Sequence, residues 1–179
     1  MKTFREIWLG LVLLATATSA AGALETFPAA DPRSVVQSVI ALTDRHGLPS
    51  WDQPSFPRKL APYLTADFIH VVKRGGDIAV RKHINLYDAE FFTGSQQVEH
   101  AKLFGATVTS QSAGAAVVEA VIGVSDDPKK EPASGDTTRF ELKREAGAWK
   151  IDDFKNLAPW AKDFPSVKTT FGDPVKYGQ

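Results

Sequence analysis

The sequence predicts an α+β fold in which N-terminal helices pack against one face of a curved, mainly antiparallel sheet. In the first half of the chain, apolar residues recur twice at helical spacing. From Ile84 onward the pattern changes to short segments of alternating apolar and polar residues, separated by turn residues. Helices followed by a run of strands are typical of domains whose helices cover one face of the sheet. A curved sheet wrapped over a helix leaves a concave space, where a small-ligand pocket is expected.

The first predicted helix runs from Asp31 to His46. Asp31-Pro32 combines an N-cap residue with proline at the first helical position, and His46-Gly47 ends the run. The apolar residues at helical spacing are Val35, Val36, Val39, Ile40 and Leu42. The prolines and aromatic residues that follow, from Leu48 to Pro62, predict an irregular connection.

Thr65 is the predicted N-cap of a second helix. The stripe at helical spacing consists of Leu64, Phe68, Val71, Gly75 and Ile78. Gly75-Gly76 weakens this helix, which leaves a continuous helix and a divided one as alternatives.

Five strands are predicted after the second helix. They cover residues 84–88, 100–109, 115–124, 137–144 and 148–154. The last two form a hairpin around Ala146-Gly147, whereas Ser125–Asp136 is predicted to be an exposed loop. The tail from Pro159 either packs across the sheet or is partly free.

The first 23 residues have the three parts of a secretory signal peptide. Lys2 and Arg5 precede an apolar run from Ile7 to Ala15, and Ala21-Gly22-Ala23 supplies the small residues before the expected cleavage. The apolar run is far shorter than the roughly 20 residues that cross a bilayer. We therefore expect residues 24–179 to form one soluble domain, periplasmic or secreted, with an irregular tail from about residue 159.

The mature chain would carry no basic excess and no cysteine. Without Lys2, Arg5 and Glu6, 19 basic and 20 acidic residues remain, which argues against nucleic acid as a partner. The lack of cysteine excludes disulfides, thiolate metal sites and a lipoprotein anchor. The sequence contains neither of the glycine-rich nucleotide-binding patterns, G-x-x-x-x-G-K-[ST] and G-x-G-x-x-G, so we expect no cofactor. We also expect no metal, because metal-ligand spacing is missing among the histidines, which are His46, His70, His83 and His100.

Two segments resemble a known family. Residues 147–154, Gly-Ala-Trp-Lys-Ile-Asp-Asp-Phe, are similar to a W-x-I-D-D strand ending, and residues 87–96, Tyr-Asp-Ala-Glu-Phe-Phe-Thr-Gly-Ser-Gln, to an acidic, aromatic segment. On these residues the chain, from about Val35 to Leu157, resembles the nuclear-transport-factor-like (NTF2-like) superfamily and its exported bacterial DUF3828 group. The resemblance implies a cystatin-like cone and a homodimer formed through the sheet. It implies no particular function, because this superfamily includes enzymes, binding modules and immunity proteins.

Asp153 is the first candidate catalytic residue. By strand alternation it shares the side of Trp149 and Ile151, which are expected in the core, whereas Asp152 shares the side of Lys150. Burial in a partly apolar cone raises the pKa of a carboxyl group, so that Asp153 could act as a general base. The structural alternative is that Asp153 accepts backbone hydrogen bonds at the end of the strand.

Asp88 is the second candidate catalytic residue, as the acid that would complete a pair with Asp153. Alternation places Asp88 and Glu90 on the side of Ile84 and Leu86, facing the cone, and the alternative is a loop with solvated acids. The candidate ligand-binding residues are Tyr87, Glu90, Phe92 and Trp149.

Two functions are consistent with these residues. The favoured one is a noncatalytic module that holds a small ligand in the cone or a periplasmic protein on the sheet. Protein binding would predict an exposed apolar patch on the sheet or the tail. The alternative is an isomerase, dehydratase or hydrolase in which Asp153 is the base and Asp88 or Tyr87 the acid.

Overall fold

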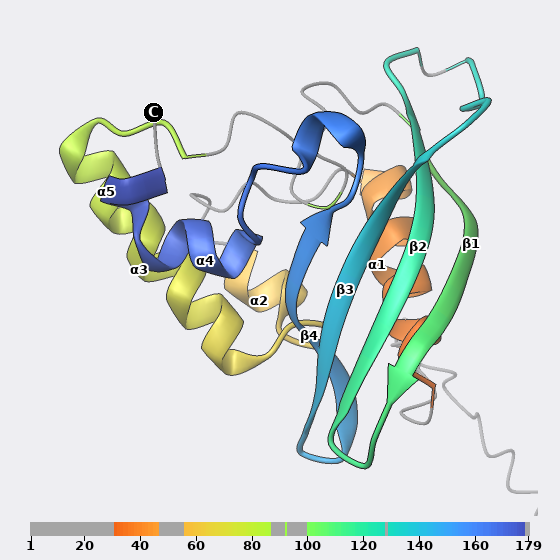
Figure 1. Ribbon diagram of the computed structural model, residues 1–179, viewed down its shortest axis with the longest axis horizontal. Helices are drawn as coiled ribbons and strands as arrows, with labels where there is room; N and C mark the ends of the chain where they lie inside the picture. Colours follow the sequence, from red (N-terminus) through yellow and green to blue (C-terminus); the bar gives the residue numbers. More distant parts are fainter. Residues whose placement is uncertain (1–30, 47–55, 87–91, 93–99, 128, 178–179) are drawn as a thin grey trace, which may run out of the picture.

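The fold is α+β, with a four-stranded antiparallel sheet in the order β1-β2-β3-β4 (Figure 1). The computed structural model describes residues 31–46, 56–86, 92, 100–127 and 129–177. Its helices are α1 (Pro32–His46), α2 (Phe56–Leu60), α3 (Ala66–Lys82), α4 (Val167–Gly172) and α5 (Pro174–Tyr177), with a short 3-10 helix η1 (Pro159–Ala161). Its strands are β1 (His100–Gln111), β2 (Ala115–Ser125), β3 (Asp136–Glu145) and β4 (Ala148–Asn156).

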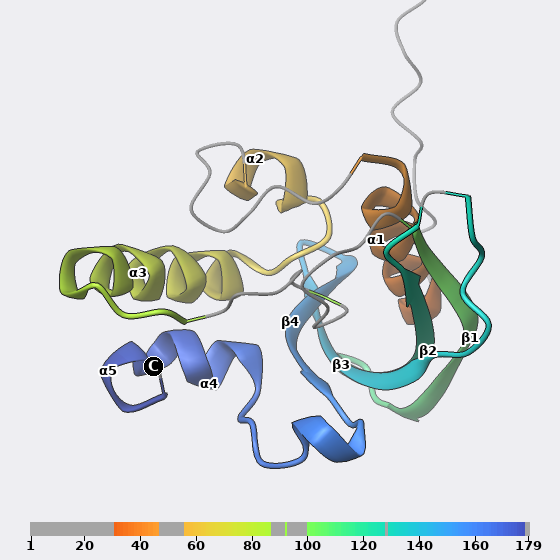
Figure 2. The ribbon, with the colours of Figure 1, turned by 90° about the horizontal axis from the view of Figure 1, so that it is seen from above.

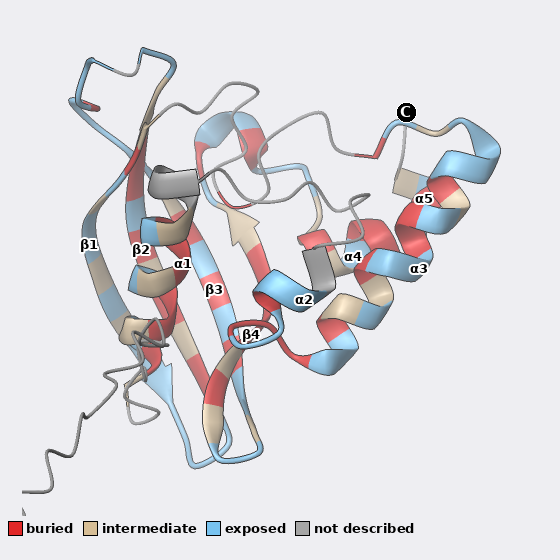
Figure 3. Cartoon of the chain, turned by 180° about the vertical axis from the view of Figure 1, so that it is seen from behind, coloured by how far each residue is buried: buried red, intermediate tan, exposed pale blue. Residues whose placement is uncertain are grey.

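The core lies between α1 and the concave face of the sheet, which curves around this helix (Figure 2). The buried residues of α1 turn toward the strands, and its exposed side faces outward (Figure 3). The buried sheet residues are Ala101, Ala116, Val118, Ala120, Ile122, Phe140, Leu142, Trp149, Ile151 and Phe154. The concave side of the sheet is therefore occupied by core packing against α1.

The two edges of the sheet have different surroundings. At β4, the Thr65 amide donates to the carbonyl of Ile151 over 2.9 Å, and the Ile151 amide donates to the carbonyl of Tyr63 over 2.8 Å. These bonds lead the chain past β4 into α3, so that the edge of β4 is covered. The other edge is formed by β1, which pairs with β2.

Helix α3 is continuous through Gly75-Gly76, so the divided alternative is wrong. A β-carbon built on Gly75 would overlap the backbone carbonyl of Phe171 in α4. Glycine at this position therefore allows α4 to lie directly against α3, an arrangement visible in Figure 2. The tail after Pro159 forms η1, α4 and α5, and α4 and α5 pack against α3, with α4 also in contact with β4. The described part of the tail is therefore not free, but it packs on α3 and not across the sheet.

The predicted first helix, the Thr65 cap and the last four strands are confirmed. The hairpin between β3 and β4 turns at Ala146-Gly147, with φ of 52° and 84°. The predicted strand that starts at Ile84 is wrong for residues 84–86, because the Ile84 amide donates to Ala79 and closes the C-terminal end of α3. Residues 87 and 88 lie outside the described part, as does the predicted signal peptide. No helix in the described part of the chain is long and apolar enough to span a membrane.

Candidate functional site

A β-bulge in β4 reverses the expected placement of the two aspartates. Phe154 lies opposite Phe140 and Ile151 opposite Leu142, with one extra residue between them on β4. Asp152 is therefore the buried aspartate, with 6% of its surface exposed, and Asp153 is half-buried. The prediction that Asp153 shares the core side of the strand is wrong, because simple alternation fails at a bulge.

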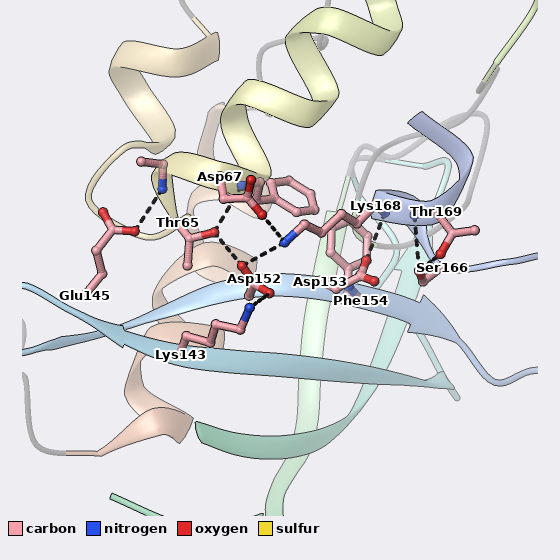
Figure 4. Close-up of polar contacts among 12 residues, drawn as sticks. Thr65, Asp67, Lys143, Glu145, Asp152, Asp153, Phe154, Ser166, Lys168 and Thr169 are labelled. Atoms are coloured by element: carbon pink, nitrogen blue, oxygen red, sulfur yellow. Dashed lines mark hydrogen bonds and ion pairs between the residues drawn. The ribbon is translucent and has the colours of Figure 1, made fainter. Parts of the chain in front are cut away.

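Asp152 accepts hydrogen bonds from three elements (Figure 4). The Thr65 hydroxyl donates to Oδ1 over 2.8 Å while it also caps α3 by accepting from the Phe68 amide. The Lys143 ammonium lies 2.7 Å from Oδ2, and the Lys168 ammonium lies 3.0 Å from Oδ1. One carboxylate thus joins the start of α3, strand β3 and helix α4.

The Asp153 side chain binds the backbone of the same lysine, Lys168. Its Oδ1 accepts from the Lys168 amide over 2.9 Å and from the Phe154 amide over 2.8 Å. The Lys168 amide belongs to the first turn of α4, where backbone N–H groups have no partner inside the helix. Asp153 accepts backbone hydrogen bonds as its structural alternative predicts, and its carboxylate completes the N-terminus of α4.

A third carboxylate, Glu145, holds the first turn of α3. Its Oε2 accepts from the Ala66 amide over 2.9 Å, and its Oε1 lies 3.1 Å from the Lys150 ammonium. The bond from Ala66, followed by that from Lys150, keeps the pKa of Glu145 below its ordinary value. We call the whole set the aspartate junction, which comprises Thr65, Asp67, Lys143, Glu145, Lys150, Asp152, Asp153 and Lys168.

Asp152 and Lys168 stabilise each other's charged forms. Burial by itself raises the pKa of Asp152, but hydrogen bonds from Lys143, Lys168 and Thr65 together hold it below its ordinary value. Burial lowers the pKa of Lys168, yet its contacts with Asp67 and Asp152 leave that pKa raised. A carboxylate that is fully ionised and already paired with two ammonium groups is a weak general base at neutral pH.

The remaining predicted site residues do not gather around the aspartates. Tyr87, Asp88 and Glu90 lie outside the described residues. Phe92 is buried in the core, with its ring centroid 4.7 Å from that of Phe154. Trp149 is also buried, with the Arg144 guanidinium 5.1 Å from its ring centroid. Its indole N–H has no hydrogen-bond partner among the described residues.

The histidines described in the structure form no metal site. His70 is exposed on α3, His83 is exposed at its C-terminal end, and His100 is half-buried at the start of β1. In the described part of the chain, no group of three or more His, Asp or Glu residues is arranged to hold a metal ion.

A row of neighbouring backbone positions runs from Phe104 in β1 through β2 and β3 to the segment after β4, and several exposed apolar residues that were not predicted from the sequence lie on or near it. Val121 in β2 lies opposite Gly105 in β1 and Thr137 in β3. The Leu157 amide, just beyond β4, donates to the Thr137 carbonyl over 2.8 Å. Four large apolar residues at these positions or close to them in the chain are exposed, with exposed fractions of 44% for Phe104, 37% for Val121, 41% for Leu157 and 56% for Trp160. We call these four residues the convex stripe.

Two contacts fix the aromatic ends of the convex stripe. The Trp160 indole N–H donates to Oδ2 of Asp136 over 3.2 Å, which holds the ring beside the start of β3. The Phe104 ring occupies the space that a side chain at Gly123 would need. Because these four residues come from β1, β2 and the segment after β4, no local pattern in the sequence marks them as neighbours.

Comparisons with known proteins give no assignment. No family model matches the sequence, and no curated protein matches it. Among solved structures, the chain is similar to the crystal structure of the intermembrane space region of the chloroplast protein ARC6, at 18% identity and a TM-score of 0.33. The match covers 71% of this chain and 92% of that one. A TM-score this low supports no argument about fold family or function.

Proposed function

We propose that this protein is an exported, noncatalytic binding module of the NTF2-like type that holds a protein partner on the convex face of its sheet. The convex stripe carries this proposal, since large apolar side chains gathered on one surface are a common feature of protein interfaces. The aspartate junction supports it indirectly. Its carboxylates are engaged in joining helices to the sheet, and the pKa of Asp152 is lowered, whereas a general base near neutral pH needs a raised one.

The convex stripe has the composition of an interface centre. Trp160 and Phe104 are large aromatic groups, a type enriched among the residues that dominate binding energy. The hydrogen bond from Trp160 to Asp136 orients the indole before any partner binds, which lowers the entropy lost on association. Val121 and Leu157 lie between them and offer aliphatic surface.

Two ion pairs lie on the strands that carry the convex stripe or beside them. Lys102 pairs with Glu131 at 2.7 Å near Phe104, and Arg139 with Glu141 at 3.6 Å farther down β3. An apolar centre with a polar, solvated rim is the usual arrangement of a non-obligate protein interface. Both signs of charge occur in this rim, which favours a protein surface of mixed charge over a strongly acidic or basic partner.

Site-specific photocrosslinking tests the proposal. A photoreactive amino acid replaces Val121 in the convex stripe or, as a matched control, Val80, which is 61% exposed on α3. In the cells that make the protein, we expect irradiation to give one discrete protein adduct from position 121 and none from position 80. Equal labelling at both positions, or a folded protein that gives no protein adduct at 121, would contradict the proposal.

A further inference from the structure

We propose that the exposed side of α3 binds an anionic phospholipid surface by peripheral contact. The helix would lie along the membrane surface without crossing it, with its basic side chains at the lipid phosphates. The residues involved are not those of the convex stripe, so the inference does not depend on the partner proposed there.

Six exposed residues share one side of α3. They recur at spacings of three and four residues, which places them in neighbouring rows on the helix surface. The buried residues of α3 occupy the opposite side, where Gly75 meets the backbone of α4. We call this exposed set the outer face of α3, which comprises His70, Lys73, Arg74, Asp77, Val80 and Arg81.

The outer face has a net positive charge. Lys73, Arg74 and Arg81 are basic, and Asp77 is the acidic residue among the six. Asp77 pairs with Lys73, with 3.6 Å between the carboxylate and the ammonium. Among the described residues, no carboxylate forms an ion pair with Arg74 or Arg81. The two guanidinium groups therefore remain available to anions outside the protein.

This basic excess is local. From Phe56 to Leu86 the chain has six basic and two acidic residues, whereas the whole chain has 21 of each and a net charge of zero. Anionic lipids give a membrane a negative surface potential, which attracts basic segments that lie close to it. A neutral protein with one basic helical face is therefore expected to meet such a surface in a preferred orientation.

Exposed valines favour a lipid surface over a wholly polar polyanion. Val80 lies on the outer face with 61% of its surface exposed, and Val175 of α5, a helix that contacts α3, is 58% exposed. At a membrane, apolar side chains enter the boundary between headgroups and acyl chains, while long basic side chains reach the phosphates. A soluble polyanion offers no such apolar layer.

The placement of α3 in the fold suits contact with an extended surface. In Figures 1 and 2 the helix projects beyond β4, away from the other strands, and its far end lies beside α5. Helix α4 packs on the side of Gly75, which is opposite to the outer face. The outer face can therefore approach a membrane without rearrangement of the described helices.

Cosedimentation with lipid vesicles tests the inference, with the protein as purified from its own cells. The vesicles contain phosphatidylglycerol and phosphatidylcholine, or phosphatidylcholine alone. Arg74→Gln/Arg81→Gln removes two charges from the outer face and keeps residue types that favour a helix. Lys129→Gln/Lys130→Gln is the matched control, because it removes two exposed charges from the loop between β2 and β3. Arg74→Lys/Arg81→Lys keeps the charge and changes the side chain.

We expect the unmodified protein, the loop control and the lysine variant to bind vesicles that contain phosphatidylglycerol. The partition coefficient of Arg74→Gln/Arg81→Gln should be on the order of twentyfold lower, since each basic residue near an anionic surface contributes roughly fivefold. Salt at about 1 M should release the unmodified protein, because it screens charges beyond a few ångströms. This salt effect tests the charge contribution even if the glutamine variant fails to give a native circular dichroism spectrum.

Three results in the vesicle experiment would overturn the proposal. They are no binding of the unmodified protein, equal binding to vesicles of phosphatidylcholine alone, and an equal loss of binding in the two folded glutamine variants. A protein adduct from the photoreactive amino acid at position 80 would also overturn it, because a protein would then occupy the outer face.

Discussion

Asp152 and Asp153 bind the two polar groups of Lys168, which are its side-chain ammonium and its backbone amide. The Lys168 ammonium lies 3.0 Å from Asp152, and the Lys168 amide donates to Asp153 over 2.9 Å. The bulge makes this possible, because it turns two successive carboxylates toward the same helix. Thr65 adds a hydrogen bond from the cap of α3 to Asp152. Single side chains in β4 thus determine where two helices begin relative to the sheet.

Loss of the Asp152 charge should weaken the fold. Asp152→Asn leaves the ammonium groups of Lys143 and Lys168 without their buried carboxylate, and we expect the free energy of unfolding to fall by on the order of 3 kcal/mol. Urea titration at neutral pH measures this. Asp77→Asn is the matched control, because the exposed pair of Asp77 with Lys73 should contribute less than about 1 kcal/mol. Equal losses in the two variants would show that the junction does not stabilise the protein.

The same carboxylate predicts a dependence on pH. The folded pKa of Asp152 lies below its unfolded value, so its contribution to stability is complete above the unfolded pKa of about 4 and is lost as pH falls through the folded pKa. Unfolding free energies at pH 7 and below pH 4 should therefore differ less in Asp152→Asn than in the unmodified protein. An identical acid dependence in both proteins would show that Asp152 is not held ionised by the fold.

At the scale of elements, the placement of α4 depends on a glycine in α3, Gly75. Gly75 lies where the backbone of Phe171 crosses, and this contact explains why a glycine is found at this position in the middle of a long helix. In an ordinary exposed helix, alanine at this position would be more stable than glycine by about 0.5–1 kcal/mol. The packing of α4 reverses that preference.

Gly75→Ala should therefore destabilise the protein, by on the order of 1–3 kcal/mol, because the new methyl group displaces α4. Gly172→Ala provides the control, since a β-carbon there meets no atom within 4 Å. Thermal unfolding followed by circular dichroism compares the two variants. A higher midpoint for Gly75→Ala than for the unmodified protein would contradict the close contact between α3 and α4.

Elements with strong local patterns could be predicted from the sequence, and those that depend on distant contacts could not. Asp31-Pro32, Thr65 and Ala146-Gly147 mark element ends by local chemistry, and each is found as predicted. The bulge at Asp152 follows from its contacts with Thr65 and α4, which are far away in the sequence. Alternation alone therefore assigned the wrong aspartate to the core.

At the scale of the whole molecule, one face and one edge of the sheet hold the fold together, and the other face is exposed. Its concave face is buried against α1, its β4 edge is joined to the helices by the aspartate junction, and its convex face carries the convex stripe. The convex stripe could not be predicted because it is assembled by strand register, which places Leu157, Val121 and Phe104 in neighbouring positions from separate segments.

Native mass spectrometry of the protein recovered gently from its own cells tests the central claim most directly. We compare Val121→Asp, which places a charge in the convex stripe, with Asp153→Asn, which changes the predicted catalytic residue. We expect a bound protein mass in the unmodified protein and in folded Asp153→Asn, and its loss in folded Val121→Asp. A bound small molecule that disappears in folded Asp153→Asn, with Val121→Asp behaving as the unmodified protein, would contradict the account and return the function to the carboxylates.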